Sequence, residues 1–154
     1  MKPVDAVGLA LVAAVAWAPG MASAVCGADV TPLNFGSYDV FAPMALRSTA
    51  TITLTCDEAP PPNVTVGLGP SSNSSVVIPR LLRNNGGLGD LQYNVFTDPA
   101  LGQVWGNGIA GGATVTVRVF RNRPAVLTVY GAIPAGQDVG AGAYRDDLPV
   151  SLLW

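Results

Sequence analysis

The feature that most constrains this chain is a short stretch, STATITLTC at residues 48–56, in which apolar and polar side chains alternate. Every second residue from Ala50 through Ile52 and Leu54 to Cys56 is apolar, and threonines stand between them. Successive side chains of a β-strand point to opposite faces of the sheet, so the alternation gives one face for a core and one for solvent. Threonine and isoleucine also favour strands. The stretch therefore predicts a half-buried β-strand.

Further segments have the composition of short strands, and turn-forming residues separate them. These segments are residues 63–68, 91–97, 113–120, 126–130 and 148–154. Glycine, proline and asparagine, which favour turns, are concentrated between them. No segment after residue 24 keeps the period of a helix, and 18 glycines with 13 prolines oppose long helices. About seven short strands with this spacing predict an all-β antiparallel sandwich.

The C-terminal segment is unusual because its alternation runs to the last residue. Leu148, Val150, Leu152 and Trp154 fall on one face of the predicted strand. A strand at the edge of a sheet carries unpaired N–H and C=O groups that recruit other chains. We therefore expect another strand to cover this edge, either from this chain or from a partner.

The N-terminal residues have the pattern of a secretory signal peptide. Lys2 precedes an apolar run at residues 6–18, and the small residues Ala22, Ser23 and Ala24 suit a cleavage site. The alternative is a transmembrane anchor, but the run is shorter than the ~20 residues that span a bilayer. We expect residues 1–24 to be a signal peptide and residues 25–154 to form one exported domain without a membrane anchor.

The chain has two cysteines, Cys26 and Cys56. An even pair in an exported protein predicts one disulfide, which would stabilise the fold by roughly 3 to 4 kcal/mol. A metal site is the alternative, but the chain has no histidine and no second pair of ligands. We therefore expect no metal and no cofactor.

The charges argue against two further classes of function. Without Lys2 and Asp5, seven arginines, no lysine and nine acidic residues remain, a net charge of −2. Nucleic-acid binding needs clustered cations, so this class is not expected. Asp146 and Asp147 are adjacent and predict a solvated pair near a turn rather than a catalytic pair. We expect no catalytic residues and no enzyme.

The order and spacing of several motifs resemble the spore coat protein U domain family, which includes the pilin subunits of archaic chaperone-usher pili. The resemblance covers essentially all of residues 25–154. Its motifs are Cys26, LNFGSY at residues 33–38, the strand ending at Cys56, Arg80 with Leu81, LQYNVFTD at residues 91–98, Trp105 with Gly106, VYGAIPAGQ at residues 129–137 and GAYRD at residues 142–146.

The resemblance implies an incomplete immunoglobulin-like β-sandwich that lacks its final strand and is completed by a donor strand. Its acceptor edge would be formed by Leu148, Val150, Leu152 and Trp154. The implied partners are a periplasmic chaperone, an outer-membrane usher and other pilin subunits. The implied location is the periplasm during assembly and then a fibre at the cell surface, with roles in cell adhesion and biofilm.

Two details refine this expectation. Only Val25 precedes Cys26 in the expected exported chain, which predicts a subunit that accepts a strand at the distal end of a fibre and does not donate one. Pro149 is expected to cost the donor strand one hydrogen bond. The alternative function is a stand-alone secreted or tip adhesin-like binding module, whose ligand would contact loops at residues 71–75 and 106–112.

Overall fold

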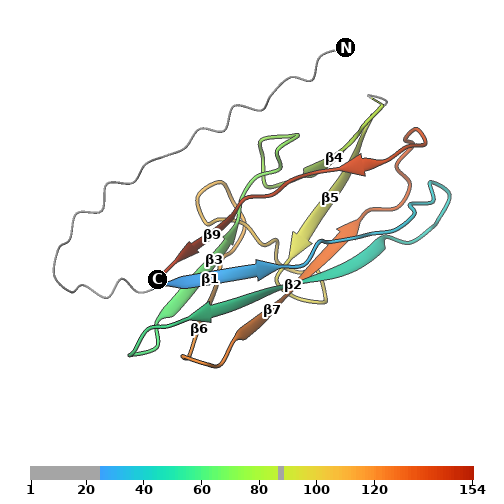
Figure 1. Ribbon diagram of the computed structural model, residues 1–154. Helices are drawn as coiled ribbons and strands as arrows, with labels where there is room; N and C mark the ends of the chain where they lie inside the picture. Colours follow the sequence, from blue (N-terminus) through green and yellow to red (C-terminus); the bar gives the residue numbers. More distant parts are fainter. Residues whose placement is uncertain (1–24, 87–88) are drawn as a thin grey trace, which may run out of the picture.

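The computed structural model describes residues 25–86 and 89–154, which form nine strands and no helix in two antiparallel sheets (Figure 1). The expected signal peptide lies outside the described residues. The six-stranded sheet has the order β1 (Cys26–Val30), β2 (Leu46–Cys56), β7 (Ala125–Ile133), β5 (Asp90–Phe96), β4 (Arg80–Asn84) and β8 (Tyr144–Arg145). The three-stranded sheet has the order β6 (Val115–Arg118), β3 (Asn63–Leu68) and β9 (Val150–Leu153).

The core lies between the two sheets and confirms the alternation in the sequence. Ala50, Ile52, Leu54 and Cys56 of β2 are all buried. Strand β2 pairs with β7 along most of its length, from Leu46 opposite Ile133 to Leu54 opposite Ala125. The predicted antiparallel sandwich is therefore confirmed.

One aromatic side chain joins the core to the second sheet. Trp105 is fully buried, and its indole N–H donates to the carbonyl oxygen of Val66 on β3 at 3.0 Å. A buried indole needs such an acceptor, so the residue has a structural place in the fold.

The predicted disulfide is present. Cys26 and Cys56 lie opposite one another in the register of β1 and β2, and their sulfur atoms are bonded. The bond links the first residue of β1 to the last residue of β2. It therefore fastens the edge strand of the larger sheet to its neighbour.

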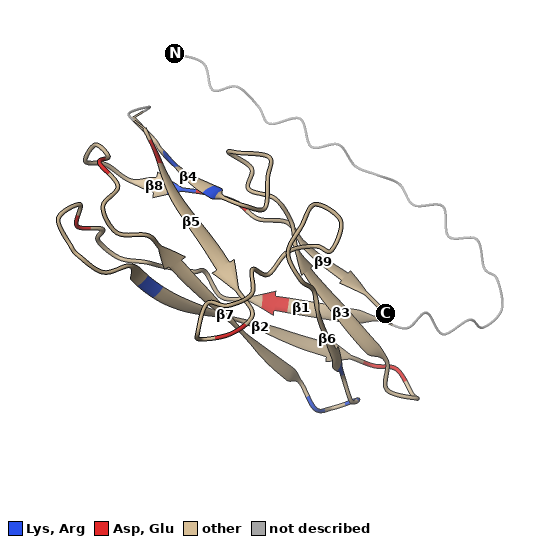
Figure 2. Cartoon of the chain, turned by 180° about the vertical axis from the view of Figure 1, so that it is seen from behind, with Lys and Arg blue, Asp and Glu red and all other residues tan. Residues whose placement is uncertain are grey.

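Charged side chains are sparse and lie mainly in loops and at strand ends, as Figure 2 shows from behind. Within residues 25–86 and 89–154, no helix is long and apolar enough to cross a membrane.

Candidate strand-acceptor groove

Two strand edges face each other across one side of the sandwich. β1 pairs only with β2, and β9 pairs only with β3, so within the described residues the outer edge of each has no neighbouring strand. Figures 1 and 2 both show the end of β9 beside the start of β1, with the two strands running in opposite directions. The two sheets are thus open along this side.

The backbone of β1 shows which of its groups face the gap. Thr31 N–H donates to Thr51 O at 3.0 Å, and Asp57 N–H donates to Val25 O at 3.2 Å. Odd-numbered residues of β1 therefore bond to β2, because in an antiparallel strand alternate residues direct their N–H and C=O groups to opposite sides. The even-numbered residues present theirs to the gap; they are Cys26, Ala28 and Val30.

The same argument identifies the open groups of β9. Gly69 N–H donates to Pro149 O at 2.8 Å, so the backbone of Pro149 faces β3. By alternation, Val150 and Leu152 direct their N–H and C=O groups to the open side. The prediction that Pro149 costs a donor strand one hydrogen bond is therefore wrong, because its missing N–H faces β3.

A cavity of about 480 Å³ lies between the end of β1 and the start of β9. Buried apolar side chains from both sheets form part of its lining; they are Ala50, Ile52, Leu68, Val95 and Val129. The chain that follows β1 adds Leu33 and Phe35 to one wall. Residues 144–148 and Val150 add the opposite wall. The cavity is thus an apolar space beside two unpaired strand edges.

The predicted acceptor residues lie at this groove, but they differ in exposure and in whether they line the cavity. Leu148 and Val150 line the cavity, and Leu148 and Leu152 are half-buried against the core. Val150 is 36% exposed. Trp154 follows the end of β9, is 49% exposed and is not among the residues that line the cavity.

A buried arginine lies beside the groove. Arg80 on β4 is fully buried, and its guanidinium donates to the carbonyl oxygens of Leu68, Gly69 and Trp105 at 2.8–3.2 Å. It also donates to Asn94 Oδ1 at 2.7 Å. Burial lowers the pKa of Arg80, and the charges of Tyr93 and Asp146 oppose that shift. Because Pro149 has no N–H to offer Gly69 O, the arginine supplies that acceptor with a donor.

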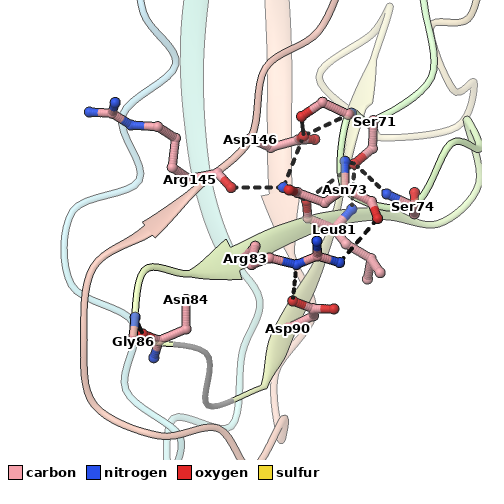
Figure 3. Close-up of polar contacts among 11 residues, drawn as sticks. Ser71, Asn73, Ser74, Leu81, Arg83, Asn84, Gly86, Asp90, Arg145 and Asp146 are labelled. Atoms are coloured by element: carbon pink, nitrogen blue, oxygen red, sulfur yellow. Dashed lines mark hydrogen bonds and ion pairs between the residues drawn. The ribbon is translucent and has the colours of Figure 1, made fainter.

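Asp146 is not the solvated residue that the sequence predicted, since it accepts several hydrogen bonds at the cavity. Tyr93 Oη donates to its Oδ2 at 2.7 Å, and Ser72 and Asn73 donate to its Oδ1. Burial and the hydrogen bond to Asp146 raise the pKa of Tyr93. Figure 3 shows Asn73 lying between Asp146, Leu81 and Arg145. Asp147, by contrast, is exposed, as expected.

The loop at residues 71–75 caps the part of the β4 edge that β8 leaves unpaired. Ser71 is buried, and its hydroxyl donates to Leu81 O at 3.2 Å while accepting from Leu81 N–H at 3.4 Å. Asn73 Nδ2 also donates to Leu81 O, at 2.9 Å. Side chains thus occupy the backbone groups that a neighbouring strand would use, which protects this edge against pairing.

Sequence reasoning missed Arg80 as a buried cross-link and missed the contact between Tyr93 and Asp146. Both depend on residues that are far apart in the chain. In the sequence, Arg80 stands in a short apolar segment and Asp146 stands before a predicted strand. Neither position indicates which residue the side chain contacts.

Comparisons with known proteins agree with this fold. The family model of the Spore Coat Protein U domain matches residues 12–151. Protein U of Myxococcus xanthus is 28% identical over an alignment of 144 residues, and the match covers 86% of this chain and 77% of that protein. A solved chaperone–tip adhesion subunit pre-assembly complex from the archaic chaperone-usher Csu pili of Acinetobacter baumannii contains a similar fold, with a TM-score of 0.55 and 15% identity.

That structural match covers 85% of this chain, which spans only 40% of the matched chain. The likeness therefore supports the sandwich fold. The family match covers most of the sequence, from residue 12 to residue 151. On that match, together with the fold and the open groove, the chain belongs to the Spore Coat Protein U domain family.

Proposed function

We propose that this protein is a structural subunit of an extracellular fibre or surface coat, and that it accepts a donor strand in the groove between β1 and β9. The observation that carries this proposal is a pair of open strand edges that face each other beside an apolar cavity. The partners would be a periplasmic chaperone, an outer-membrane usher and further subunits, met in the periplasm before display at the cell surface.

An inserted strand would satisfy both edges at once. Its backbone would pair with the open groups of Cys26, Ala28 and Val30 on one side and of Val150 and Leu152 on the other. About five alternate apolar side chains would enter the groove, each contributing ~1.5 to 3 kcal/mol on full burial. The sum, roughly 8 to 15 kcal/mol before ordering costs, is comparable with the net stability of a whole domain.

The contrast between the capped edge of β4 and the facing edges of β1 and β9 supports the same proposal. Serine and asparagine side chains occupy the backbone groups of Leu81 at the edge of β4. Within the described residues, the outer edges of β1 and β9 have no such cap. A fold that protects one edge and leaves two facing edges open is suited to strand addition.

The family and the structural likeness favour a structural role, and the chain is not an enzyme. The solved relative is a complex of a chaperone with a pilus subunit, which supports a chaperone as the first partner of this chain. The alternative, a stand-alone or tip adhesin-like binding module, assigned ligand contacts to residues 71–75 and 106–112, and for the second loop it stays open. In the first loop, Ser71 instead caps the backbone groups of Leu81 on β4.

The first prediction tests strand acceptance directly. A fluorescent peptide of about 12 residues, with valine, isoleucine or leucine at alternate positions and threonine between them, should bind the purified subunit in a fluorescence anisotropy titration. Leu152→Asp should abolish binding, because it places a charge against the core beside the open edge.

Leu153→Asp is the matched control for this experiment. Leu153 is 72% exposed and lies next to Leu152 on the other face of β9, so this variant should bind the peptide as the wild type does. Failure of the wild type to bind, or equal binding by Leu152→Asp, would overturn the proposed function. The predicted distal position stays a prediction; fibres formed by the protein alone would contradict it.

A further inference from the structure

At the end of the groove where the cavity lies, the carboxylate of Asp146 accepts hydrogen bonds from several parts of the chain. Asp146 Oδ1 accepts from Ser72 N–H at 3.1 Å, Ser72 Oγ at 2.9 Å, Asn73 Nδ2 at 3.1 Å and Asp147 N–H at 2.9 Å. Its Oδ2 accepts from Tyr93 Oη at 2.7 Å. Three parts of the chain meet at this group, namely β5, the loop before β4 and the segment that leads into β9.

These contacts fix the start of a strand that has little other support. β9 has one neighbouring strand among the described residues, and it begins shortly after Asp146. Two backbone bonds continue the attachment, from Ser72 N–H to Asp147 O at 3.2 Å and from Gly69 N–H to Pro149 O at 2.8 Å. A short strand paired on one side loses order easily. The contacts of Asp146 thus add to the support of the β9 wall at its start.

We propose that Asp146 is a positioning residue for strand acceptance, which holds the β9 wall of the groove in its docking geometry before a donor strand arrives. This inference rests on the proposed function. A wall that is already ordered costs the incoming strand less conformational entropy. The same contacts slow release, because the wall must loosen before the strand can leave.

A carboxylate suits this position better than an amide does. Asp146 accepts from five donor groups with two oxygen atoms. Asparagine has one acceptor oxygen and no charge, so its NH₂ group replaces one of the two acceptor atoms of the carboxylate. Asp146→Asn thus weakens the charge-assisted contacts with almost no change in side-chain volume. The chain offers two matched controls for this change.

The first control is Asp147→Asn. This neighbouring carboxylate also lines the cavity, but its side chain makes no hydrogen bond or ion pair within the described residues. The second control is Asp98→Asn. Asp98 accepts from the backbone N–H groups of Gly102 and Gln103 at 2.9–3.1 Å in a loop after β5 and does not line the cavity. This variant shows the effect of losing a carboxylate that supports the fold but lies away from the groove.

The experiment measures the exchange of the labelled alternating peptide from its complex with the full exported domain. An excess of unlabelled peptide is added, and the loss of anisotropy gives the release rate. Asp146→Asn should release the peptide roughly tenfold faster than the wild type. Asp147→Asn and Asp98→Asn should release it at the wild-type rate, although Asp98→Asn lowers the melting temperature.

Hydrogen exchange of the β9 amides provides the second readout. In Asp146→Asn, the amides of Ser151 and Leu153, which face β3, should exchange faster while those at the centre of β2 remain protected. A release rate in Asp146→Asn equal to that of the wild type, or equal acceleration by Asp98→Asn, would overturn the inference. Absence of peptide binding by the wild type would instead overturn the proposed function. If Asp146→Asn does not fold, Ser72→Ala removes the contacts of Ser72 Oγ with Asp146 Oδ1 and with Asp147 N–H and should show a smaller acceleration.

Discussion

Arg80 is a buried cation whose hydrogen-bond acceptors are backbone carbonyls and one asparagine oxygen. Its three nitrogen atoms reach the end of β3, the carbonyl of Trp105 and the side chain of Asn94. Such a fan of acceptors fits the planar guanidinium and does not fit an ammonium group. The side chain therefore works as a cross-link between the two sheets.

The second prediction follows from this geometry. Arg80→Lys should lower the free energy of unfolding by roughly 2 to 3 kcal/mol, because one nitrogen atom cannot reach all of these acceptors. Urea denaturation of the peptide-bound domain measures the loss. Arg83→Lys is the control, since Arg83 is exposed and pairs with Asp90 at 3.3 Å, and it should change stability by less than about 1 kcal/mol. Equal effects of the two variants would contradict the cross-link.

Tyr93 predicts a dependence of stability on alkaline pH. Burial and the hydrogen bond to Asp146 raise the pKa of Tyr93 in the folded protein, whereas in the unfolded chain the phenol ionises near pH ~10. Below that pH the phenol is neutral in both states. Above it, the unfolded chain loses the proton and the folded protein keeps it, so stability falls as pH rises.

The third prediction follows from this fall in stability at alkaline pH. The urea midpoint of the peptide-bound domain should be nearly constant from pH 7 to pH 9 and should fall above about pH 10. Tyr93→Phe, which has no ionisable group at this position, should show a shallower fall. Parallel profiles for the two proteins would mean that Tyr93 does not carry the alkaline transition.

At the residue scale, the sequence predicted the members of the core and did not predict the polar contacts. The alternation at Ala50, Ile52 and Leu54 identifies buried positions because a strand repeats every two residues. Asp146 was predicted to be solvated, since its neighbours in sequence suggest a turn. Its donors, Tyr93 and Ser72, come from other elements, and local patterns carry no information on such partners.

Among the elements, β1 matters most to the groove because it forms one wall and pairs with a single strand. The disulfide from Cys26 to Cys56 fastens this wall at its start. Without the bond, β1 would be held by its ladder to β2, which spans five residue pairs, and by the packing of Ala28 on the core. An edge ladder of this length frays readily.

The fourth prediction concerns this bond. Replacing both cysteines with serine should lower the free energy of unfolding by roughly 3 kcal/mol and should weaken binding of the alternating peptide. Urea denaturation and anisotropy measure the two effects. Mass spectrometry of alkylated periplasmic protein supplies the control, because the wild type should contain no free thiol. Unchanged peptide binding by the serine variant would mean that β1 does not need the anchor.

The sequence predicted the long strands better than the short ones. Residues 48–56, 63–68 and 91–97 correspond closely to β2, β3 and β5. Strand β6 is shorter than the predicted segment at residues 113–120. β4, with the sequence RLLRN, does not alternate strictly and was not predicted, because its pairing with β5 and its capping loop fix it.

For the whole molecule, the proposed function requires a partner strand at the facing edges of β1 and β9, which have no neighbouring strand within the described residues. The fifth prediction is that the domain expressed without a chaperone or peptide associates in a concentration-dependent way, because exposed edges pair with other chains. Light scattering after gel filtration should show oligomers that the alternating peptide converts to a monomer. A monodisperse peptide-free monomer with a melting point independent of concentration would indicate that the chain completes itself.

The position of the disulfide has a mechanical consequence for such an assembly. A donor strand between β1 and β9 would be pulled along its own length when a fibre is stretched. Its backbone bonds would then resist together in shear rather than open one after another. From β1, tension would pass through the covalent bond at Cys26 into β2, and from there into the long ladder with β7 at the centre of the sheet. In such an assembly, the cross-link would keep the groove wall from peeling away under tension.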